Sequence, residues 1–399
     1  MPALVSTAAL ALALAGCGKS APEQPGGGGP AASASPVTGA GAAAAATRNT
    51  TRLGGADPIA DAAAVALAAY PGLTPATRPQ AVVLAGARNW PAALVASALA
   101  SAPLGAPLLY ADTGGLPPAS EQALHALHPT GASVLGGAQL ILLGSSIEAP
   151  AGYRARGAAG DPYSLAASVA KLLAIARGTN PRQVIVVAAD GPPALAMPAA
   201  GLAAQSGAPI LFVTSAGVPA ATAAELRSLG RPAIYAVGST AIGERVLDQL
   251  HRFGTVVKRV EVRPGEDVTP AGNAIAVSRF LDGSFGWGVS EPGHGLAFAD
   301  ATRPFDAPAA AILSAPGDYA PLLLLEGATG AIPPLLNSYL SNIQPAAPQS
   351  QPVRGVYNHG WLIGDERAIS AMTQAELDTT LEIVPHANAS EESSSLPVE

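Results

Sequence analysis

The chain has 399 residues, of which 49% are apolar, 12% charged and 4% aromatic, and its formal net charge is −7. This length can bury a sizeable core, and the acidic balance excludes the basic stripe with which proteins neutralise nucleic-acid phosphates. The single cysteine, Cys17, excludes an internal disulfide and a cysteine-based zinc site.

The N-terminal segment is typical of an exported protein. Residues 5–15 form an apolar stretch that is too short to span a bilayer but has the length of a signal-peptide core. The stretch ends in Leu14-Ala15-Gly16-Cys17, which resembles the lipobox of bacterial lipoproteins. We therefore expect residues 1–17 to be a lipoprotein signal peptide with a lipidated Cys17. The alternative is a buried free cysteine.

Low-complexity segments flank the central part of the chain. Residues 18–47 are rich in glycine, proline, alanine and serine, which predicts a flexible tether. Residues 386–399 are polar and acidic, which predicts a disordered tail. No second apolar segment approaches the length needed to cross a membrane, so the lipid is the one expected membrane attachment.

The central part contains a threefold internal repeat. Each unit has three apolar runs without alternation, which are typical of strands buried on both faces. The first runs are Val82–Ala85, Val184–Val187 and Leu296–Ala299. The second runs are Ala106–Tyr110, Ala208–Phe212 and Ala320–Leu324. The third runs are Leu140–Leu143, Ala233–Val237 and, more weakly, Val353–Tyr357.

Alanine-rich segments such as Pro91–Ser101 and Ala194–Gln205 separate the first and second runs and predict helices. Each unit is therefore expected to be β-α-β-α-β, with a parallel sheet and right-handed crossovers. We predict an α/β fold of three tandem units, at residues 48–150, 151–255 and 256–385, the third being divergent.

The repeats resemble the cell wall-binding repeat 2 family of bacterial surface proteins. The matching segments are Thr51–Asp57, Asn89–Leu94, Gly105–Leu109, Gly207–Leu211, Val237–Ile242, Asp306-Ala307, Ala320-Pro321 and a degenerate turn at His359–Ile363. The family pattern has Arg-Tyr after the opening aspartate and an Asp where this chain has Ala92, so the chain departs from it at both places. The resemblance implies three units packed around a pseudo-threefold axis and non-covalent binding of anionic wall polymers.

The repeated unit openings supply the candidate ligand-binding residues, which are Arg52, Asp57, Arg156, Asp161, Arg263 and Asp267. The aspartates before Pro58 and Pro162 are typical of helix N-caps, although they could instead contact a ligand. The arginines could pair with these aspartates, or they could bind phosphates or carboxylates through their planar forks.

Other polar residues have simpler interpretations. The cluster Arg252, Lys258, Arg259 and Arg263 is typical of a solvated face, and polymer contact is the alternative. His125 and His128 stand three apart on an expected helix without a third metal ligand nearby, so we expect surface histidines and no metal or cofactor. Trp90, Trp287 and Trp361 are expected to pack, with sugar stacking as the alternative. The segment 283–288 is expected to be a flexible insertion.

We therefore expect a non-catalytic lipoprotein on the extracytoplasmic face of the membrane, which binds envelope polymer or a surface partner. No phosphate loop, nucleophile elbow or zinc-protease helix is present in the sequence. The alternative is a solute-binding lipoprotein of a transport system, because ligands lodge at the carboxyl ends of parallel strands. Solute receptors close two lobes around one cleft, whereas this sequence repeats three times.

Overall fold

The computed structural model describes residues 46–144, 146–315, 320–327, 330–348 and 356–386, which all belong to one compact unit, Thr38–Glu399. The expected signal peptide, Cys17 and most of the expected tether and tail lie outside the described residues. Within the described part, no helix combines the length and the apolar character needed to cross a membrane.

The first unit alternates strands and helices as predicted. Its elements are β1 (Thr50–Leu53), α1 (Pro58–Ala69), η1 (Pro75–Thr77), β2 (Val82–Gly86), α2 (Trp90–Ala96), η2 (Ser97–Ala100), β3 (Leu108–Ala111), α3 (Pro118–Leu127), η3 (Ser133–Leu135) and β4 (Leu140–Leu143). Strands β2, β3 and β4 coincide with the three apolar runs. Almost all of their residues are buried, as expected for a parallel sheet covered on both faces.

The second unit repeats this order. Its elements are β5 (Ala155–Ala158), α4 (Pro162–Arg177), β6 (Gln183–Ala188), α5 (Pro193–Ala196), α6 (Pro198–Ser206), β7 (Ile210–Val213), α7 (Ala220–Ser228), β8 (Ala233–Ala236), η4 (Ser239–Ala241) and α8 (Glu244–Leu250). The predicted helix over Ala194–Gln205 is divided between α5 and α6. Alanines dominate α6 and are fully buried, which allows neighbouring helices to approach closely.

The third unit carries additional short strands. Its elements are β9 (Val257–Arg259), α9 (Pro270–Arg279), β10 (Leu281–Asp282), β11 (Phe285–Gly286), β12 (Gly295–Asp300), α10 (Asp306–Ala310), η5 (Ala311–Ser314), β13 (Leu322–Leu325), α11 (Pro334–Asn342), β14 (Ala346–Pro348), β15 (His359–Ile363), α12 (Ala371–Thr380) and β16 (Val384–His386). Strands β14 and β16 pair with each other in parallel.

Two expectations for the third unit are wrong. Its third strand is β15 rather than Val353–Tyr357, of which Val356 and Tyr357 are 52% and 65% exposed. The sequence misled because Gly360 interrupts the apolar pattern of β15. Glycine fits there because a Cβ would lie 3.0 Å from the Leu381 side chain and 3.1 Å from the Phe298 ring, both of which would have to shift.

The glycine-rich segment 283–288 is not a flexible insertion. It contains the antiparallel hairpin of β10 and β11. Phe285 is buried and its ring stacks on Tyr235 of the second unit, with centroids 3.9 Å apart. This aromatic contact fixes the hairpin against β8.

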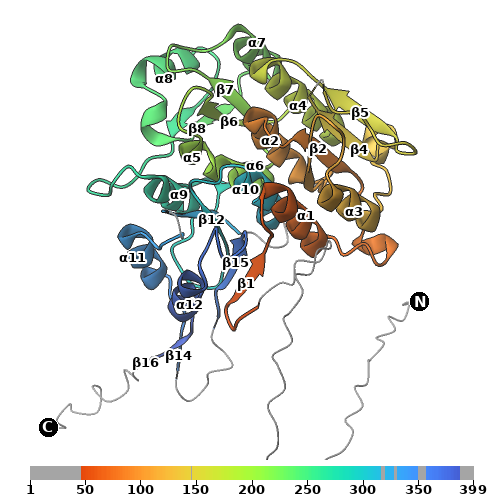
Figure 1. Ribbon diagram of the computed structural model, residues 1–399. Helices are drawn as coiled ribbons and strands as arrows, with labels where there is room; N and C mark the ends of the chain where they lie inside the picture. The colour runs from red at the N-terminus through yellow and green to blue at the C-terminus, as the bar shows by residue number, and fades with distance from the viewer. Residues whose placement is uncertain (1–45, 145, 316–319, 328–329, 349–355, 387–399) are drawn as a thin grey trace, which may run out of the picture. The chain divides into compact units, whose positions relative to one another are not determined.

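Each unit contributes strands to two of the three four-stranded sheets. The strand orders are β3-β2-β4-β5, β7-β6-β8-β9 and β13-β12-β15-β1, and all pairs in these sheets are parallel. The opening strand of a unit thus pairs with the last strand of the preceding unit. Figure 1 shows how β1 of the first unit lies beside β15 of the third and completes the cycle.

The helices repeat the same cyclic pattern. The first helix of each unit contacts the second helix of the preceding one, as α4 contacts α2, α9 contacts α6, and α1 contacts α10. The second helices α2, α6 and α10 also contact one another pairwise. Three tandem β-α-β-α-β units with parallel sheets are therefore confirmed, in the arrangement expected around a pseudo-threefold axis.

Candidate functional site

The loops at the carboxyl ends of β1, β12 and β15 meet where the third unit joins the first. All three strands are parallel, so their carboxyl ends lie at the same edge of the sheet. Ligands of open α/β sheets bind at such edges. The loops that start at Gly54, Ala301 and Gly364 form this edge, which we call the closing edge.

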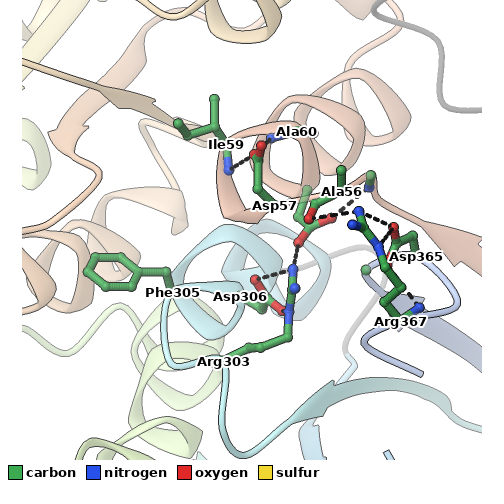
Figure 2. Close-up of polar contacts among 12 residues, drawn as sticks. Ala56, Asp57, Ile59, Ala60, Arg303, Phe305, Asp306, Asp365 and Arg367 are labelled. Carbon is green, nitrogen blue, oxygen red and sulfur yellow. Dashed lines mark hydrogen bonds and ion pairs between the residues drawn. The ribbon is translucent and has the colours of Figure 1, made fainter. Parts of the chain in front are cut away.

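Two short segments of the closing edge bind each other through the backbone. Gly364 N donates to Leu53 O at 3.1 Å, and Asp365 N donates to Gly55 O at 3.1 Å. Arg367 then bridges the same loops, since its Nη2 donates to Ala56 O at 3.3 Å while its Nε donates to Asp365 Oδ2 at 2.8 Å. Figure 2 shows Arg367 and Asp365 beside Ala56.

Asp57 ends this loop and begins α1. Its Oδ1 accepts hydrogen bonds from Ile59 N and Ala60 N, both at 3.0 Å, and Pro58 occupies the first helical position. Asp161 caps α4 in the same way through Tyr163 N and Ser164 N. The N-cap interpretation of both aspartates is confirmed, because the carboxylates satisfy amides that have no partner inside the helix.

A buried ionic cluster joins α1 to α10 behind this edge. Arg303 forms ion pairs with Asp61, on α1, and with Asp306, at the start of α10, the latter at 2.6 Å. Both carboxylate side chains are completely buried. Asp61 Oδ1 also accepts a hydrogen bond from Gly55 N at 2.6 Å, which ties the cluster to the loop after β1. Arg303 and Asp306 lie side by side in Figure 2.

The cluster holds two carboxyl groups around one guanidinium. Burial, and then the charge of Asp306, raise the pKa of Asp61 to about 8. Burial raises the pKa of Asp306 to about 6, against the opposing effect of Arg303. Two like charges that share one cation in a buried site favour retention of a proton by one of them. We therefore assign a shared proton to the Asp61–Asp306 pair at neutral pH.

An aromatic wedge lies beside the cluster. Tyr110, at the end of β3, donates from its hydroxyl to Phe305 O at 2.5 Å. The Phe305 ring packs edge-on against Tyr110 and Trp90, with centroids 5.7 and 6.0 Å apart. Trp90 thus contacts the third unit through packing. Burial and the two neighbouring aspartates raise the pKa of Tyr110, so its hydroxyl stays protonated as a donor.

The ionic cluster is specific to this junction. Alignment of the three units by the pairing of their first two apolar strands places Asp306 at the position of Ala92 and Ala194. The same alignment places Arg303 at the position of Asn89 and Gly191. Counting from the N-caps, Leu165 of α4 and Asn273 of α9 correspond to Asp61. Asn273 Nδ2 donates to Leu195 O at 2.7 Å. The junction between the second and third units therefore has a neutral amide where this junction has a carboxylate.

Arg52 lies on β1 and is only 7% exposed. Its Nη2 and Nε donate to Gln374 Oε1 at 2.9 and 3.2 Å, and its Nη1 donates to Gly364 O at 3.0 Å. The expected pairing of Arg52 with Asp57 is not formed. Burial lowers the pKa of Arg52, while nearby Glu366 and Asp365 favour its charged form. Arg52 therefore fastens β1 to β15 and α12.

Arg156 is not the structural counterpart of Arg52. In their sheets, Arg52 lies opposite Leu362, whereas Arg156 lies opposite Ile141. The residue equivalent to Ile141 in the third sheet is Trp361, so Arg156 is one position out of step with Arg52. Arg259, rather than Arg156, occupies the position of Arg52. A slip of one residue in a strand moves a side chain to the other face. Arg156 is half-buried, and its side chain forms no hydrogen bond or ion pair with another described residue, so the expected pair with Asp161 is absent too.

The third predicted pair does not repeat the first two. Arg263 and Asp267 are exposed. The N-cap of α9 is Thr269, whose Oγ1 accepts a hydrogen bond from Gly272 N at 3.0 Å. Arg263 N donates to Glu266 Oε2 at 3.2 Å. The six predicted residues therefore do not assemble into one site or three equivalent ones.

Acidic partners surround part of the basic cluster. Lys258 pairs with Asp282 at 2.8 Å, and Arg259 pairs with Glu244 and Glu261 at 2.7 and 3.0 Å. His125 and His128 are exposed on α3 and at its C-cap, with ring centroids 5.8 Å apart. Over the ranges that the structure describes, no three histidine, cysteine or carboxylate side chains gather as a metal site.

Asp61 and Arg303 were missed by the sequence reasoning. A usable signal existed for Asp61, which is the one charged residue in the alanine-rich segment 58–69. Arg303 gave none, because its partner Asp61 is 242 residues away in the chain. Asp306 was recognised as part of a motif but not as a buried acid.

Comparisons with known proteins agree with this architecture. Residues 156–246, within the second unit, match the family model of cell wall binding domain 2, which confirms the resemblance to cell wall-binding repeat 2 there. The chain is similar to Cwp6 from Clostridium difficile, at 17% identity and a TM-score of 0.61 over 84% of this chain and 48% of that one. It is also similar to Cwp8 from the same organism, at 18% identity and a TM-score of 0.61 over 84% and 52%. The chain thus spans about half the length of each, and the likeness shows the fold. No curated protein matches the sequence.

Proposed function

We propose that this chain is a non-catalytic surface protein whose three-unit module binds a polymer or a protein partner of the bacterial cell envelope. The observation that carries the proposal is the match of residues 156–246 to cell wall binding domain 2. The cyclic arrangement of three sheets supports it further. A solute receptor would close two lobes around one cleft, and the exchange of strands among three sheets does not favour that alternative.

We further propose a lipid anchor at Cys17, which would hold the module on the extracytoplasmic face of the membrane. The support is the apolar segment 5–15 followed by Leu14-Ala15-Gly16-Cys17. Envelope binding would add a second point of attachment and so strengthen surface retention. Metabolic labelling with palmitate checks this anchor. Label on the wild type and its loss in Cys17→Ser is the expected outcome, and equal labelling of both would contradict it.

Three of the candidate ligand residues already have structural partners. Arg52 is enclosed, and the exposed Asp57 and Asp161 are engaged as helix caps. Arg156 lies on the edge strand β5 and has a guanidinium that pairs with no described side chain. The exposed Arg263 forms no ion pair with a described residue, although its charge lowers the pKa of the nearby Glu266. We propose these two arginines as contacts for phosphate or carboxylate groups of an anionic polymer.

Co-sedimentation with purified cell walls of the source organism tests the polymer hypothesis. The full chain carrying Cys17→Ser would be mixed with intact walls and with walls stripped of anionic polymer by acid. We expect sedimentation with intact walls and a large loss after stripping. Binding should also weaken as salt rises, since ionic contacts are screened. No sedimentation with intact walls would overturn polymer binding.

A matched pair of arginine variants sharpens this test. Arg156→Ala and Arg263→Ala should weaken binding to intact walls, because each removes a guanidinium that forms no ion pair with a described residue. Arg88→Ala serves as the control, since Arg88 is exposed but paired with Asp112 at 2.8 Å. Equal effects of all three substitutions would argue against a specific contact at Arg156 and Arg263.

A further inference from the structure

A cavity of about 530 Å³ opens at the amino-terminal ends of β12 and β15, opposite the closing edge. Its volume lies within the range of ligand pockets. The lining residues are Gly293, His294, Gly295, Val356, Tyr357, His359 and Trp361. None of these side chains carries a carboxylate, an ammonium or a guanidinium, so the cavity suits an uncharged ligand.

Two aromatic groups form one wall of this cavity. His359 and Trp361 lie two residues apart on β15, so both point to the same face of the strand. Their ring centroids are 5.1 Å apart and the rings meet edge to face. Tyr357, 65% exposed, adds an aromatic side chain to the lining. Such rings offer apolar faces together with polar edges.

The cavity also provides uncharged hydrogen-bonding groups. His359 Nε2 lies 3.1 Å from Thr51 Oγ1, and its other ring nitrogen has no hydrogen bond to a described residue. The His294 imidazole forms no hydrogen bond with any described residue, whereas the backbone amides of Gly293 and His294 are already bound by Asn358 Oδ1. Burial lowers the pKa of both histidines, against the effects of Glu291 and Asp378, which favours the neutral form of both rings.

We infer that this cavity binds a neutral saccharide, with a sugar ring stacked on the aromatic wall and its hydroxyls bound by the His294 and His359 imidazoles. A pyranose combines apolar C–H faces with uncharged donors and acceptors at its rim, which matches this lining. The inference rests on the proposed function for the source of the sugar, the glycan part of an envelope polymer. The site itself lies apart from the arginines proposed for charged groups.

Calorimetric titration of the full chain carrying Cys17→Ser tests the site directly. The probes are maltose, cellobiose and N,N′-diacetylchitobiose at millimolar concentrations, with glucose 6-phosphate as the charged comparison. We expect at least one neutral disaccharide to bind and the phosphorylated sugar to bind more weakly. Failure of all three neutral probes would overturn the inference.

Substitutions at exposed or half-exposed positions locate the binding without disturbing the core. Tyr357→Ala and His294→Ala should each weaken the neutral probe about three- to tenfold, as expected for loss of an aromatic or hydrogen-bonding contact. His125→Ala on the exposed face of α3 is the matched control and should leave affinity unchanged. Unchanged affinity in both cavity variants would place the sugar elsewhere and overturn the assignment.

The saccharide and cell-wall experiments can fail independently. Sedimentation with intact walls but no disaccharide binding would leave the proposed function standing and overturn the cavity assignment. Disaccharide binding without wall sedimentation would leave the cavity as a sugar site and overturn polymer binding.

Discussion

Arg303 of the third unit forms an ion pair with Asp61 of the first, across 242 residues of sequence. The pair lies beside the loop that follows β1, the strand that completes the third sheet. A polar contact therefore marks the junction at which the first unit closes on the third. The equivalent positions elsewhere hold Leu165 and Asn273, so the fold does not require charge there.

Removal of the guanidinium should be strongly destabilising. Arg303→Met leaves the carboxyl groups of Asp61 and Asp306 buried without their cation, and loss of one partner from a buried ion pair costs about 3–5 kcal/mol. Urea denaturation followed by circular dichroism measures this loss in the free energy of unfolding. The control Arg88→Ala removes an exposed ion pair and should cost less than about 1 kcal/mol.

The stability lost in Arg303→Met should be restored when all three residues of the cluster are replaced by those at the junction between the first and second units. The triple variant Asp61→Leu, Arg303→Asn and Asp306→Ala introduces the residues found at Leu165, Asn89 and Ala92. Replacement of a buried ionic group by packed apolar residues is often neutral or stabilising. The triple variant should therefore be more stable than Arg303→Met. A triple variant as unstable as the single one would show that the cluster is required for closure.

The same cluster should make stability fall as pH rises. The pKa values of Asp61 and Asp306 are raised to about 8 and about 6. A carboxyl with a raised folded pKa stabilises fully below its ordinary pKa, near 4, and this contribution is lost as pH rises through the folded value. The pair therefore lowers the free energy of unfolding as pH rises from about 4 to about 8.

Comparison with Asp61→Asn isolates this effect. The amide cannot ionise, so the slope of unfolding free energy against pH between about pH 6 and pH 8 should be less negative in the variant than in the wild type. His294 and His359 have lowered pKa values and contribute in the opposite direction below pH 6.5, equally in both proteins. Urea midpoints across this range give the slopes, and parallel pH profiles would contradict the assignment of a buried proton to Asp61.

Alanine substitutions distinguish the contribution of a capping side chain to stability from that of a neighbouring residue that caps no helix. Asp57→Ala and Thr269→Ala should each lower stability by about 1 kcal/mol, because each removes the acceptor for free amides at a helix start. Asp267→Ala is the matched control. Asp267 is exposed, and its backbone carbonyl, which the substitution keeps, accepts a hydrogen bond from Thr269 N. Thermal unfolding measures all three, and a loss at Asp267 equal to that at Thr269 would refute the cap assignment.

Asp161 adds a pH signature to its cap. Hydrogen bonds from Ser164, first through its hydroxyl and then through its amide, lower the pKa of Asp161. A carboxyl with a lowered folded pKa stabilises above its ordinary pKa, and that stability is lost as pH falls through the folded value. Asp161→Ala should therefore lower the melting temperature at pH 7, with a smaller difference from wild type at strongly acidic pH.

Local sequence patterns predicted much of this fold. The runs around Val83, Ile185 and Ala297 read as buried strands because parallel strands covered on both faces need no alternation. Asp57 and Asp161 were identified as N-caps because the cap and the following proline are adjacent in sequence. Such signals are contained within a few residues, and tertiary contacts did not override them.

Contacts between distant segments were not predictable in the same way. Strands β1, β5 and β9 are short, and β5 contains arginine and glycine, so none of them reads as a strand until its partner is known. The equivalence of Arg52 and Arg156 failed for a related reason. The loop between strand and cap differs by one residue in the two units, and sequence spacing alone aligned the caps rather than the strands.

The difference between these two arginines gives a final prediction. Arg52→Ala removes donors from Gln374 Oε1 and Gly364 O in a buried site, which should cost about 1–3 kcal/mol and loosen β1 from β15. Arg156→Ala removes no hydrogen bond to a described residue, so its effect on stability should stay within about 0.5 kcal/mol. Urea denaturation measures both, and amide hydrogen exchange in β1 should accelerate only in Arg52→Ala. Similar losses in the two variants would restore their equivalence, whereas the contrast would show that Arg52 closes the ring of sheets and leaves Arg156 available for a ligand.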